Sequence, residues 1–122
     1  MPSRDDAPDQ FDCLVIESWT ASYPDPIDLA KDEPVTLDGR SDCWDGHIWL
    51  WAKNRAGKEG WIPDCLIAGT DPPRATEPYS ALELTCRKGE TLAAKRVLHG
   101  WAFCSSRRGQ SGWVPLRNIQ RL

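Results

Sequence analysis

Aromatic side chains are the residues of this 122-residue sequence whose type and spacing could do chemistry. Trp49 and Trp51 stand two positions apart, and Trp101 and Phe103 repeat that spacing 52 residues later. On a strand both rings of a pair would point to one face, because successive side chains alternate between faces. Two rings on one face form a platform on which an extended chain or a flat cation can stack. Binding through aromatic surfaces is therefore the first chemistry that the sequence suggests.

Residues that carry catalysis or hold metals form no comparable pattern. His47 and His99 are isolated, and the five cysteines include no Cys-x-x-Cys pair, so the spacing of zinc ligands is absent. We find no glycine-rich phosphate loop, nucleophile motif or spaced pair of carboxylates. We therefore expect a protein that is not an enzyme and that has no catalytic residue, metal or cofactor.

The aromatic pairs belong to an internal duplication. The segment 48–63, IWLWAKNRAGKEGWIP, recurs at 100–115 as GWAFCSSRRGQSGWVP, with tryptophan, glycine and proline at matching positions. Each copy has a strand of alternating pattern, a polar turn with a glycine, and a second strand that ends at proline. A constant offset over this many positions indicates two copies of one structural unit.

The duplication predicts the domain organisation. Residues 11–68 form a first domain, residues 69–73 a short linker with one glycine and two prolines, and residues 74–122 a second domain. Residues 1–10 are expected to be a disordered tail. Ten prolines, nine glycines and the lack of helical periodicity predict an all-β fold.

The two predicted domains have opposite net charges, although the whole chain carries −3. Residues 11–68 hold eleven acidic and five basic residues, a net charge of −6. Residues 74–122 hold three acidic and nine basic residues, a net charge of +6. We expect this difference and the short linker to favour contact between the domains within the chain.

The sequence also predicts where the protein works. It contains no apolar run long enough to cross a bilayer, and the N-terminal MPSRDDAPDQ lacks the apolar stretch of a signal peptide. An odd number of cysteines favours reduced thiols, with Cys86 and Cys104 in the core. We expect a cytoplasmic protein without membrane contact.

The order of these segments resembles two Src-homology-3 (SH3) domains in tandem. Residues 15–21 and 75–81 stand where the family has its Ala-Leu-Tyr-Asp-Tyr-x-Ala strand, and residues 83–92 are similar to its Glu-Leu-Ser-Phe-x-x-Gly-Asp-x-Leu segment. The two duplicated segments are similar to its Trp-Trp-x-Ala and Gly-Tyr/Trp-Ile/Val-Pro strands. The resemblance implies two small five-stranded barrels, each closing with a short 3₁₀ turn, close to the variant forms found in bacterial proteins.

In this family an aromatic groove binds extended, proline-rich peptides. The resemblance implies one such groove in each domain. In the first domain the peptide-binding residues would be Trp19, Asp25, Asp28, Trp49, Trp61 and Pro63. In the second they would be Tyr79, Glu83, Trp101, Trp113 and Pro115. Both copies depart from the family at the same two points, where Glu17 or Glu77 and Leu66 or Asn118 replace groove tyrosines.

Three functions stay open at this point. The first is a tandem module that binds an extended, possibly proline-rich peptide or a flexible protein segment, with Trp49 and Trp101 open to solvent. The second is binding of nucleic acid or of an acidic partner by the basic second domain. Its arginines near the aromatic strand are Arg107, Arg108, Arg117 and Arg121. The third is a structural scaffold whose grooves are buried between the domains.

Overall fold

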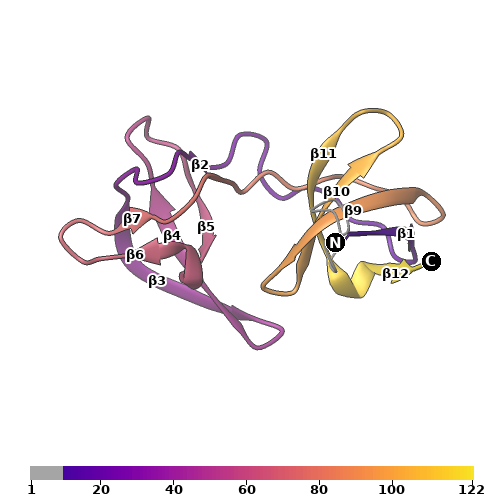
Figure 1. Ribbon diagram of the computed structural model, residues 1–122, viewed down its shortest axis with the longest axis horizontal. Helices are drawn as coiled ribbons and strands as arrows, with labels where there is room; N and C mark the ends of the chain where they lie inside the picture. Colours follow the sequence, from indigo (N-terminus) through magenta and orange to yellow (C-terminus); the bar gives the residue numbers. More distant parts are fainter. Residues whose placement is uncertain (1–9) are drawn as a thin grey trace, which may run out of the picture. The chain divides into compact units, whose positions relative to one another are not determined.

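The described part of the chain, residues 10–122 of a computed structural model, consists of strands and two short 3₁₀ helices, with no α-helix among these residues (Figure 1). The predicted all-β class is therefore confirmed. Apart from Gln10, the tail expected at 1–10 lies outside the described residues. Within the described part, no helix has the length and apolar character that a bilayer crossing would require.

The chain folds into two compact units, but they do not follow the predicted boundaries. Unit 1 combines the chain up to Ser22 with Glu83–Leu122, and unit 2 is the continuous segment Tyr23–Leu82. The predicted division into 11–68 and 74–122 is wrong, because the expected linker at 69–73 lies inside unit 2. The chain instead passes from unit 1 to unit 2 after Ser22 and returns after Leu82.

Unit 1 contains one antiparallel five-stranded sheet in the order β11-β10-β9-β1-β12 (Figure 1). Its elements are β1 (Phe11–Val15), β9 (Thr91–Leu98), β10 (Trp101–Ser106), β11 (Ser111–Pro115), η3 (Leu116–Asn118) and β12 (Ile119–Arg121). The first strand lies between two strands from the far end of the chain, since Cys13 pairs with Leu92 on one side and Arg121 on the other.

Unit 2 is built from three smaller sheets, β3-β4-β5, β2-β8 and β6-β7. Its elements are β2 (Asp28–Leu29), β3 (Thr36–Trp44), β4 (His47–Lys53), β5 (Glu59–Pro63), η2 (Asp64–Leu66), β6 (Ile67–Ala68), β7 (Arg74–Ala75) and β8 (Tyr79–Ser80). The predicted 3₁₀ turn follows the proline of the duplicated segment in both units. The sheets are open at their edges, so the structure does not confirm two closed barrels.

The opening strands of the two repeats are exchanged between the units. In unit 1 the backbone N–H of Val15 donates to the carbonyl of Glu90, 2.8 Å away. In unit 2 the N–H of Ala75, the matching residue of the second repeat, donates to the carbonyl of Glu33 at 3.0 Å. Each opening strand therefore completes the sheet of the other repeat.

A second set of backbone contacts repeats this exchange a few residues further on. Trp19 of the first repeat and Cys86 of the second exchange two N–H···O bonds of 2.9 Å. In unit 2 the matching pair is Tyr79 of the second repeat and Leu29 of the first, which face each other across β2 and β8. The exchange thus extends beyond the strands into the segments that follow them.

The hairpins of the duplicated segments form as predicted, with glycine where the backbone requires it. Gly57 and Gly109 have φ angles of 84° and 81°, in the left-handed region that only glycine adopts without cost. The N–H of each glycine donates over 3.1 Å to a carbonyl three residues earlier, that of Asn54 or Ser106. The two hairpins are therefore copies in conformation as well as in sequence.

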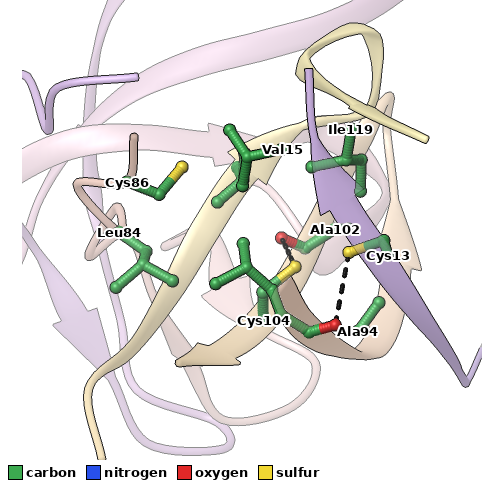
Figure 2. Close-up of a cluster of buried hydrophobic side chains, with 10 residues drawn as sticks. Cys13, Val15, Leu84, Cys86, Ala94, Ala102, Cys104 and Ile119 are labelled. Carbon is green, nitrogen blue, oxygen red and sulfur yellow. Dashed lines mark hydrogen bonds between the residues drawn. The ribbon is translucent and has the colours of Figure 1, made fainter. Parts of the chain in front are cut away.

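The core of unit 1 is built from small and medium side chains, several of which converge in Figure 2. Cys86 and Cys104, predicted as core residues, are buried together with Cys13. The thiols of Cys13 and Cys104 donate to the carbonyls of Leu92 and Ala102, both over 3.6 Å. A hydrogen bond with Cys13 and burial raise the pKa of Cys104, which keeps its thiol protonated at neutral pH.

Candidate functional site

The aromatic residues of β4 and β5 share one face of unit 2, as the alternation predicts. Trp51 lies opposite Trp61, and Trp49 lies opposite Pro63. Ala52, which has the other parity, is fully buried in the core. The hairpin therefore carries a row of rings on the face that points away from the core.

Unit 1 repeats this arrangement on β10 and β11. Phe103 lies opposite Trp113 and Trp101 opposite Pro115. The ring centroids of Phe103 and Trp113 are 5.3 Å apart with an interplanar angle of 74°. The equivalent pair in unit 2 is separated by 5.1 Å at the same angle. The duplication has therefore preserved the geometry of an edge-to-face aromatic pair.

Trp49 and Trp101 are not the open platforms that we predicted. Their exposed fractions are 8% and 9%, so both rings are buried. In unit 1 the reason is visible, because Trp19 packs against Trp101 edge-on with centroids 5.4 Å apart. Strand parity assigned these rings to the correct face, but parity does not tell which rings other side chains cover, as Trp19 covers Trp101. Their burial favours a structural role for these two residues.

Trp19 and Glu83, predicted in different grooves, lie together in unit 1. The indole N–H of Trp19 donates to Oε1 of Glu83 over 3.0 Å. The same oxygen accepts the backbone N–H of Ser22, also at 3.0 Å. The Glu83 carboxylate therefore accepts two hydrogen bonds from the first repeat. The strand exchange places Trp19 in unit 1 and Trp49 in unit 2, instead of in one domain as predicted.

Tyr79 of the second repeat is likewise found in the other unit. We predicted it beside Trp101, but it lies in unit 2, where its hydroxyl donates to the carbonyl of Trp61 over 3.2 Å. Tyr79 is 8% exposed, and Trp113 in unit 1 is 6% exposed. The remaining predicted groove residues, Pro63 and Pro115, are fully buried. Among the predicted aromatic residues, Trp19 and Trp61 keep a partly exposed surface.

The predicted acidic residues of unit 2 already hold a cation. Nζ of Lys58 lies 3.0 Å from Oδ1 of Asp25 and 4.0 Å from Oδ1 of Asp28. The hydrogen bond to Asp25, with the charges of both carboxylates, raises the pKa of Lys58. Both aspartates are exposed, so a ligand cation would have to compete with Lys58 for them.

Two aromatic residues of unit 2 that lie together, Tyr23 and Trp51, were not in the predicted groove. Tyr23, 39% exposed, packs against Trp51 with ring centroids 5.9 Å apart, and Trp51 packs against Trp61. The guanidinium carbon of Arg40 lies 4.7 Å from the centroid of Trp51. We call these four residues the outer aromatic cluster. Strand parity had already placed Trp51 on this face, whereas Tyr23 and Arg40 come from loop and bulge geometry that no sequence pattern reveals.

A hollow of about 720 Å³ lies elsewhere in unit 2, between residues 28–34, the hairpin tip at 54–56 and Arg74. Its lining mixes acidic and basic side chains, and Asp28 is the one predicted groove residue among them. The hollow is therefore separate from the aromatic face.

Unit 1 carries a group of exposed cations on two neighbouring turns. We call Arg87, Lys88, Arg107 and Arg108 the basic turns. Glu90 links the two turns, because its Oε1 accepts the backbone N–H of Arg87 over 2.8 Å and its Oε2 lies 3.5 Å from the guanidinium of Arg108. Arg121, predicted with this group, instead stacks on the Phe11 ring at 4.9 Å.

Comparison with known proteins gives one local similarity. The chain is 36% identical over 53 residues to Protein nervous wreck of Drosophila melanogaster, a match that covers 43% of this chain and 5% of that protein. The chain therefore matches only a small part of its relative. No protein-family model matches the chain, and no solved structure matches it either. The strand-rich fold and the local similarity are consistent with the SH3 resemblance of the sequence.

Proposed function

We propose that the chain is a non-enzymatic, SH3-like binding module whose partner is an extended peptide or a flexible segment of another protein. The observation that carries the proposal is the aromatic pair preserved on the outer face of both units, with the same interplanar angle of 74°. Flat apolar rings beside polar loops suit an extended chain, which can lay alternate side chains on such a surface.

The strand exchange supports this proposal in one further respect. The surface at Trp19 combines residues from both repeats, since Trp19 packs on the buried Trp101 and donates to Glu83, so neither repeat supplies this surface by itself. Small interfaces bind weakly, and two of them on one chain gain affinity when one partner engages both. A single long segment is therefore a better partner than two short peptides.

The test is a titration of the full chain with uncharged extended peptides, with tryptophan fluorescence as the measure of binding. One set of peptides is rich in proline and the other contains none. We expect Trp51→Ala and Phe103→Ala each to weaken binding. Ile48→Ala is the matched control, because Ile48 is an exposed apolar residue of β4 with the opposite parity. The proposal fails if no such peptide binds, or if both aromatic variants bind as well as the parent chain.

Binding of an acidic partner is a second candidate, and the basic turns favour it. Three of their four cations are arginines, whose planar guanidinium groups bind carboxylates and phosphates in a bidentate manner. The described part of unit 1 carries eight basic and four acidic residues, a net charge of +4. The check is titration with an acidic peptide and with an oligonucleotide at two salt concentrations. Binding that does not weaken with salt would exclude this candidate.

A further inference from the structure

The outer edge of β3 in unit 2 differs from the equivalent edge in unit 1. β3 and β9 correspond, because each pairs with the first strand of a duplicated segment. Among the described residues, β9 lies between β10 and β1, whereas β3 is the last strand of the sheet β3-β4-β5. The edge of a sheet presents N–H and C=O groups with which a further strand can pair. Unit 2 therefore lacks a strand at a position that unit 1 fills.

Two prolines end the pairing at this edge of unit 2. In unit 1, β1 pairs with β9 over four residues. In unit 2 the segment that matches β1 forms a bridge between Arg74 and Pro34. The next contact is the last, and in it the carbonyl of Pro73 accepts the N–H of Val35 over 3.0 Å. Pro73 and Pro72 have no N–H with which to continue the ladder, so β3 extends beyond its neighbour.

The hairpin turn identifies the backbone groups that point outward from β3. β3 and β4 are joined by the two residues Asp45 and Gly46, whose φ angles are 48° and 84° (Figure 1). The residues that flank such a turn form a hydrogen-bonded pair, and bonded and non-bonded pairs alternate along the ladder. Asp42 therefore bonds to β4, whereas Ser41 and Cys43 direct their N–H and C=O groups away from it.

An irregular stretch limits the open edge to the end of β3. The register with β4 shifts between Leu37 and Ser41, and within this stretch the backbone N–H of Arg40 donates to Oδ1 of Asp38 over 2.9 Å. Bulges and charged side chains commonly prevent pairing at a sheet edge. Here they end before Ser41, and residues 41–43 are exposed. The stretch 41–43 is therefore accessible to an added strand.

The side chains of this stretch indicate which residues such a strand would carry. Ser41 and Cys43 lie on the same face as Ala52, and Ile48, opposite Cys43, is 43% exposed. Directly opposite residues of paired strands have side chains on the same face. The residues of an added strand that bond to Ser41 and Cys43 would therefore place their side chains beside Cys43, where apolar groups fit.

We propose that β3 binds an extended segment of a partner protein, which adds to its outer edge as an antiparallel strand with apolar residues at alternate positions. The orientation follows from β1, which is antiparallel to β9 at the equivalent edge of unit 1. Addition of a strand to an open edge is a general way in which sheets bind peptides. This inference rests on the proposed function for the kind of partner, and it adds a second surface that recognises the partner's backbone.

The test is a titration of the full chain with a short, end-capped peptide of alternating valine and threonine, followed by amide hydrogen exchange in NMR spectra. We expect the peptide to slow the exchange of the Ser41 and Cys43 N–H groups about tenfold or more. The Asp42 N–H, which already bonds to β4, should change little. Absence of slowed exchange at Ser41 and Cys43 would contradict the proposal.

The same measurement on the chain without peptide identifies other occupants of the edge. Slow exchange at Ser41 and Cys43 in a dilute sample would show that the chain itself fills the edge. Slow exchange that develops only as the chain concentration rises would identify a second copy of the chain as the occupant. Either result overturns the proposal.

Methylated peptides test the direction of the hydrogen bonds. Methylation of the valine amides removes the N–H groups that face β3, and methylation of the threonine amides removes those that face away. We expect the valine-methylated peptide to bind at least about tenfold more weakly than the threonine-methylated one. Equal affinities of the two peptides would show that no ladder forms.

A proline at position 41 tests the edge from the side of the chain. Ser41→Pro removes an N–H that β4 does not use, and it should weaken binding of the strand peptide about tenfold. Ser41→Ala is the matched control, because it keeps the N–H and should bind as the parent chain does. Equal binding by the two variants contradicts the proposal. If Ser41→Pro distorts β3, the two methylated peptides decide the result on the parent chain.

A proline-rich peptide separates this inference from the proposed function. Such a peptide has few N–H groups to donate to a ladder, so its binding reports the aromatic surfaces and should be unchanged in Ser41→Pro. A chain that binds the strand peptide at β3 but no proline-rich peptide keeps the β3 site and loses the aromatic one. A chain that binds only the proline-rich peptide keeps the proposed function and loses the β3 site.

Discussion

The two units share one backbone framework and differ in the side chains placed on it. The turn before β9 in unit 1 reads Arg87-Lys88-Gly89-Glu90, and the turn before β3 in unit 2 reads Ala30-Lys31-Asp32-Glu33. In both turns the glutamate accepts a backbone N–H three residues earlier, at 2.8 Å and 3.1 Å. The comparison teaches that duplication preserved hydrogen bonds while charge and surface chemistry diverged.

The cores differ at two positions that the exchanged strands bring together. Unit 1 receives the larger opening residue, Val15, and has Cys86 where unit 2 has Leu29. Unit 2 receives the smaller opening residue, Ala75, and has the larger core residue, Leu29. Because protein interiors are close-packed, we expect the larger opening residue to be accommodated best beside the smaller core residue, as in the exchanged arrangement.

Separating the repeats should have the largest effect. A fragment of residues 10–68 lacks β7 and β8, and a fragment of residues 69–122 lacks β1. Neither should fold alone, whereas the two mixed together should recover the native near-ultraviolet signal and elute as one complex. The segment 23–82 should fold by itself, because it contains all the strands of unit 2. Independent folding of the two repeats would contradict the exchange.

Glycines at equivalent positions should respond differently to alanine. A Cβ on Gly112 would lie 2.6 Å from the backbone of Leu84, which cannot move aside. A Cβ on Gly60 would meet the end of the Ile27 side chain at 2.8 Å. We expect Gly112→Ala to lower the free energy of unfolding by about 3 kcal/mol and Gly60→Ala by about 1 kcal/mol. Urea denaturation measures both, and equal losses would show that the two sites are equally crowded.

Exchanging the opening residues sharpens the argument from core volume. Val15→Ala should cost about 2 kcal/mol through the cavity it leaves, and Ala75→Val should cost about 1 kcal/mol by overpacking. In the exchanged fold the two sites lie in different units, so the double variant should lose the sum. A double variant more stable than that sum would indicate that the opening strands had returned to their own repeats.

The smallest effect concerns the pH dependence of the outer aromatic cluster. Hydrogen bonds from the backbone and side chain of Arg40 lower the pKa of Asp38. The Asp38–Arg40 pair is therefore intact above the ordinary aspartate value of about 4 and is lost as the pH falls through the lowered pKa. We expect a small change in Trp51 fluorescence in that acidic range. The change should be absent from Arg40→Ala, and its persistence there would assign it to another group.

The sequence predicted the parts of the fold that depend on local pattern. The alternation around Trp51, the glycine turns at Gly57 and Gly109 and the buried Cys104 follow from spacing and residue type, and the structure confirms them. The strand exchange could not be predicted in this way. In a duplicated chain each opening strand has the pattern that either sheet accepts, and the choice depends on how three-dimensional volumes fit.

The candidate site shows the same limit. Parity assigned Trp49 and Trp101 to the aromatic face, but it carries no information about which side chains cover them. Tyr23 and Arg40 reach Trp51 from a loop and from an irregular stretch of β3, where the register with β4 shifts. Contacts made through space by irregular segments have no period in the sequence, and so these residues were missed.

The placement of β1 also fixes the order in which the protein can be completed on the ribosome. Cys13 and its partner Arg121 are 108 residues apart in the sequence, so β1 is synthesised well before the strands with which it pairs. Unit 2 can close as soon as its own 60 residues have emerged, while β1 waits for several seconds at usual elongation rates. During that interval the nascent chain displays an unpaired strand, and unit 1 becomes whole only when β12 has emerged from the ribosome.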